Sequence, residues 1–335
     1  MSIAHPTPPS AIGDLMEGIL YQVKRIVVGQ ERFLERVMVA MLAGGHLLVE
    51  GVPGLAKTLT VKTLADTIRG HFKRIQFTPD LVPADLVGTR IYNQKTGEFS
   101  TSLGPVFTNL LLADEINRAP AKVQSALLEV MQERQVTIAG EMHRVPHPFL
   151  VMATQNPIET EGTYPLPEAQ VDRFMMKVLV NYPSDEEEFV IVQRALGPLI
   201  KAAPVASTEQ LAALQEKARE VYVDPALIRY AVRLVSATRT PEKFGLKDVG
   251  RFIACGASPR ASIHLAEGAQ ALALMRARTY ALPEDIAALA PDVLRHRVTL
   301  SYEGLSEGVS ADALIERIVQ ATPAPVWAGH EMRAA

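Results

Sequence analysis

The segment GVPGLAKT, residues 51–58, has the residue types and the spacing of a loop that binds phosphate groups. Gly51, Lys57 and Thr58 match the pattern G-x-x-x-x-G-K-[ST], and Ala56 replaces the glycine that normally precedes the lysine. Backbone N–H groups of such a loop point at the phosphates, Lys57 would reach the β- and γ-phosphate oxygens, and Thr58 would offer a hydroxyl to Mg²⁺. A left-handed Ala56 would cost about 1–2 kcal/mol, so we expect nucleotide binding to survive the replacement.

Two carboxylates and an amide follow other apolar runs. The run LLLADEI, residues 110–116, ends in Asp114 and Glu115, and ATQNP, residues 153–157, contains Asn156. The carboxyl ends of strands are where open α/β sheets bind ligands. Because side chains alternate along a strand, Asp114 can support Mg²⁺ while Glu115 polarises an attacking water, and Asn156 could orient that water. An acidic pair at a strand end and an asparagine before a proline also occur without any such role.

Two arginines have the chemistry to act on a phosphate. Arg173 lies in QVDRF, residues 170–174, and an arginine can neutralise charge during phosphoryl transfer, also from a neighbouring subunit. Arg260 lies in GASPR, residues 256–260, in the first turn of a predicted helix, where a cation opposes the helix dipole. That position makes sense if an anion such as a γ-phosphate lies opposite. The alternatives are an ordinary ion pair between Arg173 and Asp172, and an incidental position for Arg260.

Hydrophobic periodicity predicts the elements that position these residues. A strand at residues 46–50, the phosphate loop and a following helix form one βα unit. Three further short apolar runs predict strands buried on both faces of a parallel sheet, at residues 74–77, 109–113 and 149–153. No buried strand is predicted after about residue 197. Helices are predicted at residues 11–27, around 34–41, at 120–132, from Ser184 (a capping box with Glu187) to Leu196, and from Ser207, Asp224, Ser258 and Leu314 onward.

Two segments interrupt the alternation of strands and helices. Residues 90–107 carry a turn signal at Thr96-Gly97, and residues 135–146 alternate around Gly140, so both predict β-hairpins set into loops. They are either plain surface hairpins or elements that reach toward a substrate. The predicted fold class is α/β, a parallel sheet flanked by helices and followed by a small all-helical domain. The predicted division is a Pro-rich flexible leader at 1–10, an α/β core at 11–203, a helical domain at 204–322 and a tail at 323–335.

Composition limits the classes of function. The chain of 335 residues has a net charge of −3 and no long basic run, so nothing favours nucleic acid or an anionic membrane. Cys255 is the single cysteine, which excludes an intramolecular disulfide and argues against a cysteine-based zinc site. No apolar run reaches the ~20 residues of a spanning helix, and no signal sequence is evident. We therefore expect a soluble protein in the reducing cytoplasm.

Together these motifs resemble those of the AAA+ ATPases and, within them, the MoxR family. GVPGLAKT, LLLADEINRAP, ATQNP, PEAQVDRF and GASPRA occur in the order of that family's motifs, and the resemblance covers roughly residues 12–320. It implies that Gly51–Thr58 is the Walker A loop, and alanine before the lysine is usual in this branch. By the same match, the segment Val28-Gly29-Gln30 lies near the adenine. The implied nucleotide contacts are Gly29, Gln30, Gly51, Val52, Pro53, Gly54, Leu55, Ala56, Lys57, Thr58, Leu59 and Asp114.

The resemblance also implies a role for each remaining motif residue. Asp114 and Glu115 would form Walker B, Asn156 would be sensor 1, Arg173 the arginine finger acting on the next subunit, and Arg260 sensor 2. Thr58 and Asp114 would support the Mg²⁺ ion. The two hairpins resemble inserts that face the pore or the surface of the ring in relatives. His143 and Arg144 are exposed candidates for contacts at the tip of the second hairpin, or else solvated turn residues.

The function implied is an Mg²⁺-dependent ATPase that forms a ring, expected to have six subunits, and remodels client proteins like a chaperone. ATP is expected between the α/β core and the helical lid of one subunit, with Arg173 of the next subunit closing the site. Relatives often act with a partner that carries a von Willebrand factor A domain. The alternatives are a nucleic-acid motor or loader of the AAA+ type, which the mildly acidic composition disfavours, and an ATP-binding scaffold with little turnover, which Glu115 and Asn156 disfavour. A small-molecule kinase would need an acceptor pocket, for which the sequence has no signature.

Overall fold

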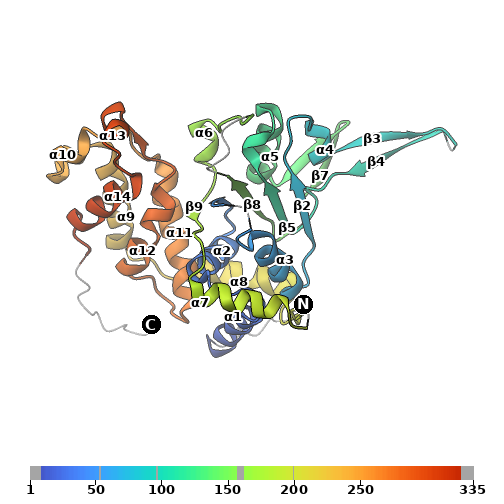
Figure 1. The fold of residues 1–335 in the computed structure, drawn as a ribbon, viewed down its shortest axis with the longest axis horizontal. Coiled ribbons are helices and arrows are strands. Elements are labelled where there is room, and N and C mark those ends of the chain that lie inside the picture. Colours follow the sequence, from blue (N-terminus) through green and yellow to red (C-terminus); the bar gives the residue numbers. More distant parts are fainter. Residues whose placement is uncertain (1–8, 53, 96, 157–161, 199, 326–335) are drawn as a thin grey trace.

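A parallel sheet with helices on both faces forms the centre of the molecule, and a helical region lies beside it (Figure 1, left). The computed structural model describes residues 9–52, 54–95, 97–156, 162–198 and 200–325. Most of the predicted leader and tail therefore lies outside the described residues, and the first helix begins at Pro9, within the predicted leader. The predicted fold class, an α/β core followed by a helical lid, is confirmed.

Five parallel strands form the sheet in the order β2-β5-β8-β1-β9. The register pairs Gln76 with Asp114 and Glu50 with Gln155, so these residues reach the same edge of the sheet. The carboxyl ends of the strands therefore bring the predicted functional residues together, as expected for an open α/β sheet. The strands are β1 (Leu47–Glu50), β2 (Phe72–Gln76), β5 (Leu110–Asp114), β8 (Leu150–Gln155) and β9 (Met176–Leu179).

The three central strands are buried on both faces. Along β5, Leu110 and Leu112 belong to one hydrophobic cluster, while Leu111 and Ala113 belong to the cluster on the opposite face. The same alternation occurs along β1 and β8, which confirms the prediction of burial on both faces for these strands. The prediction is wrong for β2, where Ile75 is the one buried residue, because β2 lies at the edge of the described sheet and pairs with β5. The strand β9 at the other edge was not predicted.

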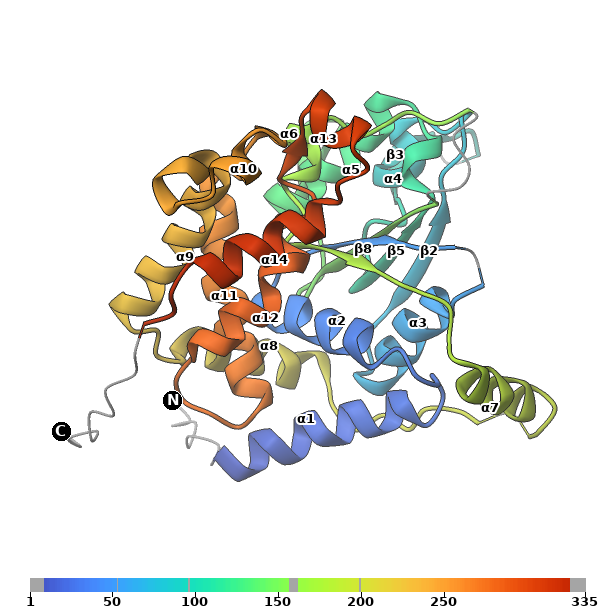
Figure 2. The same cartoon turned by 60° about the vertical axis from the view of Figure 1, so that its left-hand side comes forward.

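Helices cover the two faces of the sheet unequally. In Figure 2, α2 (Glu31–Ala43) and α3 (Lys57–Thr67) lie next to the strands, with α1 (Pro9–Lys24) beyond them. The opposite face is covered by α4 (Pro83–Val87) and α5 (Ala121–Glu133), which follows the short 3₁₀ helix η1 (Ile116–Arg118). The predicted capping box is confirmed at α7 (Asp185–Ala195), where Ser184 and Glu187 bond each other's backbone N–H. The short helix α6 (Glu168–Val171) precedes β9.

Two β-hairpins extend from the core. The first pairs β3 (Gly88–Asn93) with β4 (Glu98–Leu103) and projects well away from the body of the molecule (Figure 1, right). The second pairs β6 (Gln135–Ile138) with β7 (Glu141–Arg144). His143 is not at its tip, contrary to expectation. His143 lies within β7, after the turn. Its half-buried ring makes an edge contact with Phe107, with the ring centroids 6.3 Å apart.

The region after residue 207 is helical, as predicted, with starts at Thr208, Pro225 and Pro259 directly after the predicted capping residues. It also contains an antiparallel pair of short strands, β10 and β11, and the helices α10, α12 and α13, none of which was predicted. Within the described part of the chain, no helix has both the length and the apolarity to span a membrane. The elements are α8 (Thr208–Glu220), α9 (Pro225–Arg239), η2 (Pro241–Phe244), α10 (Lys247–Gly250), β10 (Ile253–Cys255), α11 (Pro259–Met275), α12 (Pro283–Leu294), β11 (Thr299–Leu300), α13 (Tyr302–Ser306) and α14 (Ala311–Ala321).

The helical region and the core share one hydrophobic cluster. This cluster runs without a break from α1, α2 and α3 through the sheet to α8, α9, α11, α12 and α14. Buried polar contacts reinforce the junction: Arg36 Nε donates to Asp292 Oδ2 at 2.7 Å, and Gln215 Nε2 donates to the Met41 carbonyl at 2.6 Å. The first of these joins α2 to α12, and the second joins α8 to α2.

Candidate functional site

The loop between β1 and α3 has the backbone that the phosphate-loop pattern requires. A Cβ atom on Gly51 would lie 2.5 Å from the Val180 carbonyl oxygen, so only glycine fits there. Ala56, directly before α3, has φ 54° and ψ 16°, so the left-handed conformation considered from the sequence is present. The left-handed backbone of Ala56 therefore destabilises this loop by about 1–2 kcal/mol. Pro53 lies outside the described residues.

Lys57 is the first residue of α3, and its ammonium group points back across the loop. Nζ donates to the Gly51 carbonyl at 2.5 Å. Partial burial lowers the pKa of Lys57 from its ordinary value, and the nearby carboxylates of Asp114, Glu115 and Glu50 oppose that shift. Among the described residues, the Gly51 carbonyl is the hydrogen-bond partner of Nζ, and a partly dehydrated cation with a neutral partner is well placed to bind an anion.

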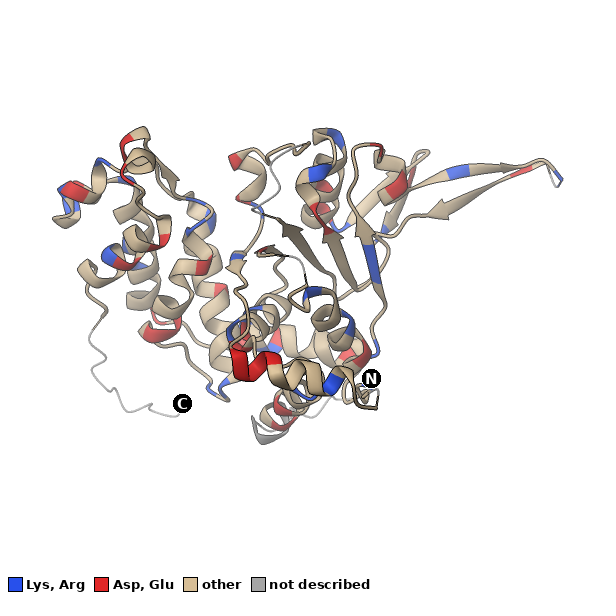
Figure 3. Cartoon of the chain, viewed as in Figure 1, with Lys and Arg blue, Asp and Glu red and all other residues tan. Residues whose placement is uncertain are grey.

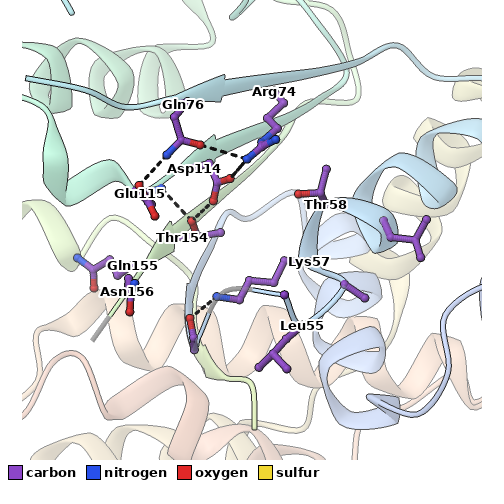
Figure 4. Close-up of a pocket in the computed structure, with 14 residues that line it drawn as sticks. Leu55, Lys57, Thr58, Arg74, Gln76, Asp114, Glu115, Thr154, Gln155 and Asn156 are labelled. Atoms are coloured by element: carbon purple, nitrogen blue, oxygen red, sulfur yellow. Dashed lines mark hydrogen bonds and ion pairs between the residues drawn. The ribbon is translucent and has the colours of Figure 1, made fainter. Parts of the chain in front are cut away.

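A cavity of about 400 Å³ lies at the carboxyl edge of the sheet, beside the loop (Figure 4). Its volume is within the range of small-molecule sites. Its wall brings together predicted residues from three separate segments of the chain and adds four polar residues that were not predicted to act there, namely Arg74, Gln76, Thr154 and Gln155. The lining residues are Gly51, Gly54, Leu55, Ala56, Lys57, Thr58, Leu59, Arg74, Gln76, Asp114, Glu115, Thr154, Gln155 and Asn156.

The Asp114 carboxylate accepts hydrogen bonds on both oxygens. The Thr154 hydroxyl donates to Oδ1 at 2.5 Å, and Arg74 donates to Oδ2 from Nη2 at 2.6 Å and from Nε at 3.0 Å. Thr58 lines the same cavity. A carboxylate and a hydroxyl beside a phosphate-binding loop are the kinds of ligand that Mg²⁺ uses, since it is usually held by one or two carboxylates together with phosphates.

Glu115 lies just beyond the end of β5. Its backbone is left-handed, with φ 56° and ψ 51°, so strand alternation, from which its direction was predicted, does not set the direction of its side chain. Its N–H donates to the Thr154 hydroxyl at 2.9 Å. Its Oε2 accepts from Gln76 Nε2 at 2.7 Å and lies 2.9 Å from Arg118 Nε. These contacts hold Glu115 at the cavity wall beside Asp114 (Figure 4).

A second, more apolar cavity of about 320 Å³ continues from the first. It shares Gly54, Leu55, Ala56 and Leu59 with the first cavity, called here the phosphate-side cavity because Lys57 lines it. Its other walls come from residues 25–30 and from the segment around α7, and they include Val28, Gln30 and Ile191. An apolar slot continuous with a phosphate-binding loop suits a flat heteroaromatic base.

Two predicted contacts lie outside both cavity walls. A Cβ atom on Gly29 would lie 2.3 Å from Glu187 Oε1, so this glycine permits close packing against α7. Val52 packs against the hydrophobic core instead of lining either cavity. Gly29 and Val52 therefore contact neighbouring parts of the fold and do not line the cavities.

The two predicted arginines lie apart from this site. Arg173 and Arg260 line a separate cavity of about 180 Å³ together with His46, Met131, Gln132 and His264. Among the described residues, every residue that lines the phosphate-side or the apolar cavity lies between positions 25 and 200. The expected site between the core and the lid of one chain is therefore not what these two cavities form.

Asp172 links the two arginine segments. It is bonded by Arg297 Nε at 2.7 Å, by Arg260 Nη1 at 3.3 Å and by the Ser258 hydroxyl at 2.9 Å. Burial opposes the charged form, but these donors, above all Arg297, hold the pKa of Asp172 below its ordinary value. The anion opposite Arg260 in this structure is therefore Asp172. The alternative pairing of Arg173 with Asp172 is not what the described contacts show.

Comparison with known proteins places the chain in a family. Residues 46–176 match the family described as "ATPase family associated with various cellular activities (AAA)", and residues 247–318 match the AAA lid domain. The chain is 54% identical over 330 residues to "Chaperone MoxR1" of Mycobacterium tuberculosis, an alignment that covers 97% of this chain and 88% of that protein. The chain belongs to the MoxR family of AAA+ ATPases.

Two further relatives agree with this assignment. "Protein MoxR" of Paracoccus denitrificans is 33% identical over 324 residues, covering 90% of this chain and 93% of that protein. A solved structure from Cytophaga hutchinsonii, described as that of a candidate ATPase, superposes with a TM-score of 0.90 at 46% identity and covers 95% of this chain and 97% of that chain. Membership in this family implies that the chain binds a nucleotide, and the two connected cavities are where the described residues offer a site for one.

Besides Gln155, the site residues that the sequence patterns did not identify are Arg74, Gln76 and Thr154. Each lies at or near the carboxyl end of a sheet strand, and together they bond both carboxylates of the acidic pair. The available signal was the rule that polar side chains at that edge of an open sheet meet the ligand. We applied that rule to Asp114 and Asn156 but not to Arg74 and Gln76 on β2 or to Thr154 on β8.

Proposed function

We propose that this MoxR-family chain is an Mg²⁺-dependent ATPase. The observation that carries the proposal is the convergence of Lys57, Asp114, Glu115 and Asn156 on one cavity beside a phosphate-binding loop. A phosphoryl-transfer site needs these groups: a cation and N–H groups for the phosphates, a carboxylate for the metal, and polar groups that position a water. When bound, Mg²⁺ would offset the charge of the β- and γ-phosphates.

Each residue of this chain has a separate task in that site. Lys57 and the loop N–H groups would bind the phosphates, while Thr58 and Asp114 would hold the metal or its bound water. Glu115 would accept a proton from the attacking water, and Asn156 would orient that water. The apolar cavity would exclude water from the base.

We propose a ring, expected to have six subunits, in which Arg173 contacts the nucleotide of the next subunit. The position of Arg173 in a cavity apart from its own chain's nucleotide site supports this arrangement. Because Arg260 lines the same cavity and is joined to that segment through Asp172, both arginines are proposed to serve the neighbouring site. Charge neutralisation by such an arginine is a large term in phosphoryl transfer.

We propose that the ring remodels client proteins and does so with a partner that carries a von Willebrand factor A domain. The first part is supported by the similarity to "Chaperone MoxR1", and the second part rests on the family resemblance. The projecting β3–β4 hairpin supports contact with polypeptide, since Tyr92 and Phe99 are 51% and 58% exposed on it. Figure 3 shows acidic and basic residues interspersed over the elements, which is unlike the basic stripe of a nucleic-acid motor.

The test of the ATPase assignment is a Glu115→Gln variant. It should bind ATP as tightly as the parent protein but release phosphate at least about 100-fold more slowly, because an amide cannot accept the proton. Phosphate release and equilibrium ATP binding measure the two effects, and Glu129→Gln, on α5 and outside the cavity wall, is the matched control. Unchanged phosphate release in the Glu115 variant would remove Glu115 from this role.

Mixed rings test the shared site. Arg173→Ala subunits should bind ATP but not hydrolyse it, and mixing them with Glu115→Gln subunits should restore part of the activity. Restoration is expected because some interfaces would combine an intact Glu115 with an intact Arg173 from the neighbour. Mixtures that stay inactive at every ratio would contradict the assignment of Arg173 to the next subunit.

A further inference from the structure

Both oxygens of Asp114, the proposed metal-supporting carboxylate, already have donors. The Thr154 hydroxyl donates a hydrogen bond to Oδ1, and Arg74 donates two hydrogen bonds to Oδ2, from Nε and Nη2. Any cation that uses Oδ2, directly or through a bound water, must therefore replace the guanidinium group. The structure shows a protein cation next to the carboxylate that is proposed to support a metal.

Arg74 comes from the edge strand β2, where it has room to move. Its side chain is 50% exposed, while that of Asp114 is 19% exposed. Among the described residues, the guanidinium makes one further hydrogen bond besides those to Asp114, from Nη2 to Gln76 Oε1 at 3.1 Å. The described contacts of the Arg74 side chain are made by its guanidinium group. The side chain can therefore rotate into solvent at small energetic cost, since exposed ion pairs contribute little to stability.

Arg74 also lines the cavity in which the phosphates would lie. From that position it is connected to both carboxylates of the acidic pair, because Gln76, which accepts from Arg74, donates to Glu115 at 2.7 Å (Figure 4). Release of Arg74 from Asp114 would therefore also alter the hydrogen bonding of the residue that holds Glu115.

We propose that Arg74 is a metal-competing residue: its guanidinium balances the charge of Asp114 in the metal-free site, and Mg²⁺ binding requires its release. The inference rests on the proposed role of Asp114 in metal support. Two cations cannot share one carboxylate oxygen at full strength, because each weakens the attraction for the other. Binding of the metal and release of the arginine are thus linked, and Arg74 sets the Mg²⁺ concentration at which the site fills.

The direct test is the Mg²⁺ dependence of nucleotide binding in an Arg74→Gln variant. A fluorescent ADP analogue is titrated first without metal and then with increasing Mg²⁺, which needs no catalytic turnover. Lys73→Gln is the matched control, because it removes the same charge from the neighbouring position of β2, which does not line the cavity. Arg74→Lys keeps the charge but loses the paired bond to Asp114.

Half-saturation by Mg²⁺ should occur at an about two- to fivefold lower concentration in Arg74→Gln, as expected for the loss of a partly exposed competing ion pair. Arg74→Lys should lie between this variant and the parent protein, and Lys73→Gln should match the parent. Metal-free affinity for the ADP analogue should be no higher in Arg74→Gln than in Lys73→Gln, because Arg74→Gln leaves the Asp114 charge unbalanced beside the phosphates.

Three results would overturn the inference. An unchanged or a higher Mg²⁺ requirement in Arg74→Gln would show that the arginine does not compete with the metal. A loss of metal-free affinity in that variant, together with the Mg²⁺ requirement of the parent protein, would make Arg74 a phosphate ligand instead. If the parent protein binds the analogue without any effect of Mg²⁺, the proposed metal site itself is wrong, and the inference fails with it.

Discussion

Replacing Thr154 with valine should disable the acidic pair while leaving the phosphate-binding loop intact. The Thr154 hydroxyl donates to Asp114 Oδ1 at 2.5 Å and accepts from the Glu115 N–H at 2.9 Å. Thr154 is 2% exposed, so water cannot easily replace the hydroxyl. Valine has almost the same shape, and the substitution therefore removes two hydrogen bonds without opening a cavity.

The expected cost follows from these two bonds. A hydrogen bond to a charged group contributes about 1.5–3 kcal/mol and a neutral one about 0.5–1.5 kcal/mol. Because Asp114 is 19% exposed and can recover part of its solvation, we expect the free energy of unfolding to fall by about 2–3 kcal/mol. Glu115 would lose the bond that fixes its left-handed backbone, so turnover should fall about 10- to 100-fold, or about 1.4–2.7 kcal/mol in activation free energy.

Three measurements on two variants decide the question. Urea unfolding gives stability, phosphate release gives turnover, and equilibrium binding gives ATP affinity, which should change little in Thr154→Val because the loop around Lys57 is untouched. Thr154→Ser keeps the hydroxyl and should behave almost like the parent protein. The reasoning is refuted if the serine variant is as impaired as the valine variant, or if the valine variant keeps full turnover.

Three other perturbations test the surroundings of the site. Burial lowers the pKa of His46 and of His264 to about 3, below the unfolded value of 6.5, so the unfolded chain takes up protons first as the pH falls. Stability in urea should therefore drop by about 1 kcal/mol per histidine between pH 6.5 and 5.5, and a flat profile would contradict this. Asp172→Asn should destabilise the fold by about 3 kcal/mol in the same assay, because Arg297 is a buried cation, and an unchanged midpoint would argue against that anchor. Gly51→Ala should weaken ATP binding at least about tenfold, since a Cβ atom would lie 2.5 Å from the Val180 carbonyl, whereas parental affinity would show that the loop can shift.

The parts of the site that are local in sequence were predictable. The loop at Gly51–Thr58 is a continuous pattern, and Asp114 and Asn156 follow apolar runs that could be placed at one edge of a parallel sheet. Thr154 and Arg74 act through neighbours on adjacent strands, so their roles depend on strand order and register. The sequence alone does not state that β2 lies next to β5 with Gln76 opposite Asp114.

The strand β9 shows a different limit. Lys177 interrupts its short apolar run, and a lysine inside a buried strand normally argues against that assignment. In the structure, Lys177 Nζ lies 2.5 Å from Glu50 Oε2 on β1, so the charge is paired across the sheet. The compensating residue is more than a hundred positions away in the chain, and no local pattern could have connected the two.

The location of Arg260 depends on how the helical region is joined to the core. Since that region shares one hydrophobic cluster with α2 and α3, moving it against the core of its own chain would expose apolar surface. It would also separate Arg36 from Asp292, and breaking a buried pair of this kind costs about 3–5 kcal/mol when one charge is left unpaired. Movement of this junction in each ATPase cycle would have to overcome both terms. The arrangement therefore favours a core and lid of one chain that move together, and in the proposed ring Arg173 and Arg260 would then reach the neighbouring site as one face.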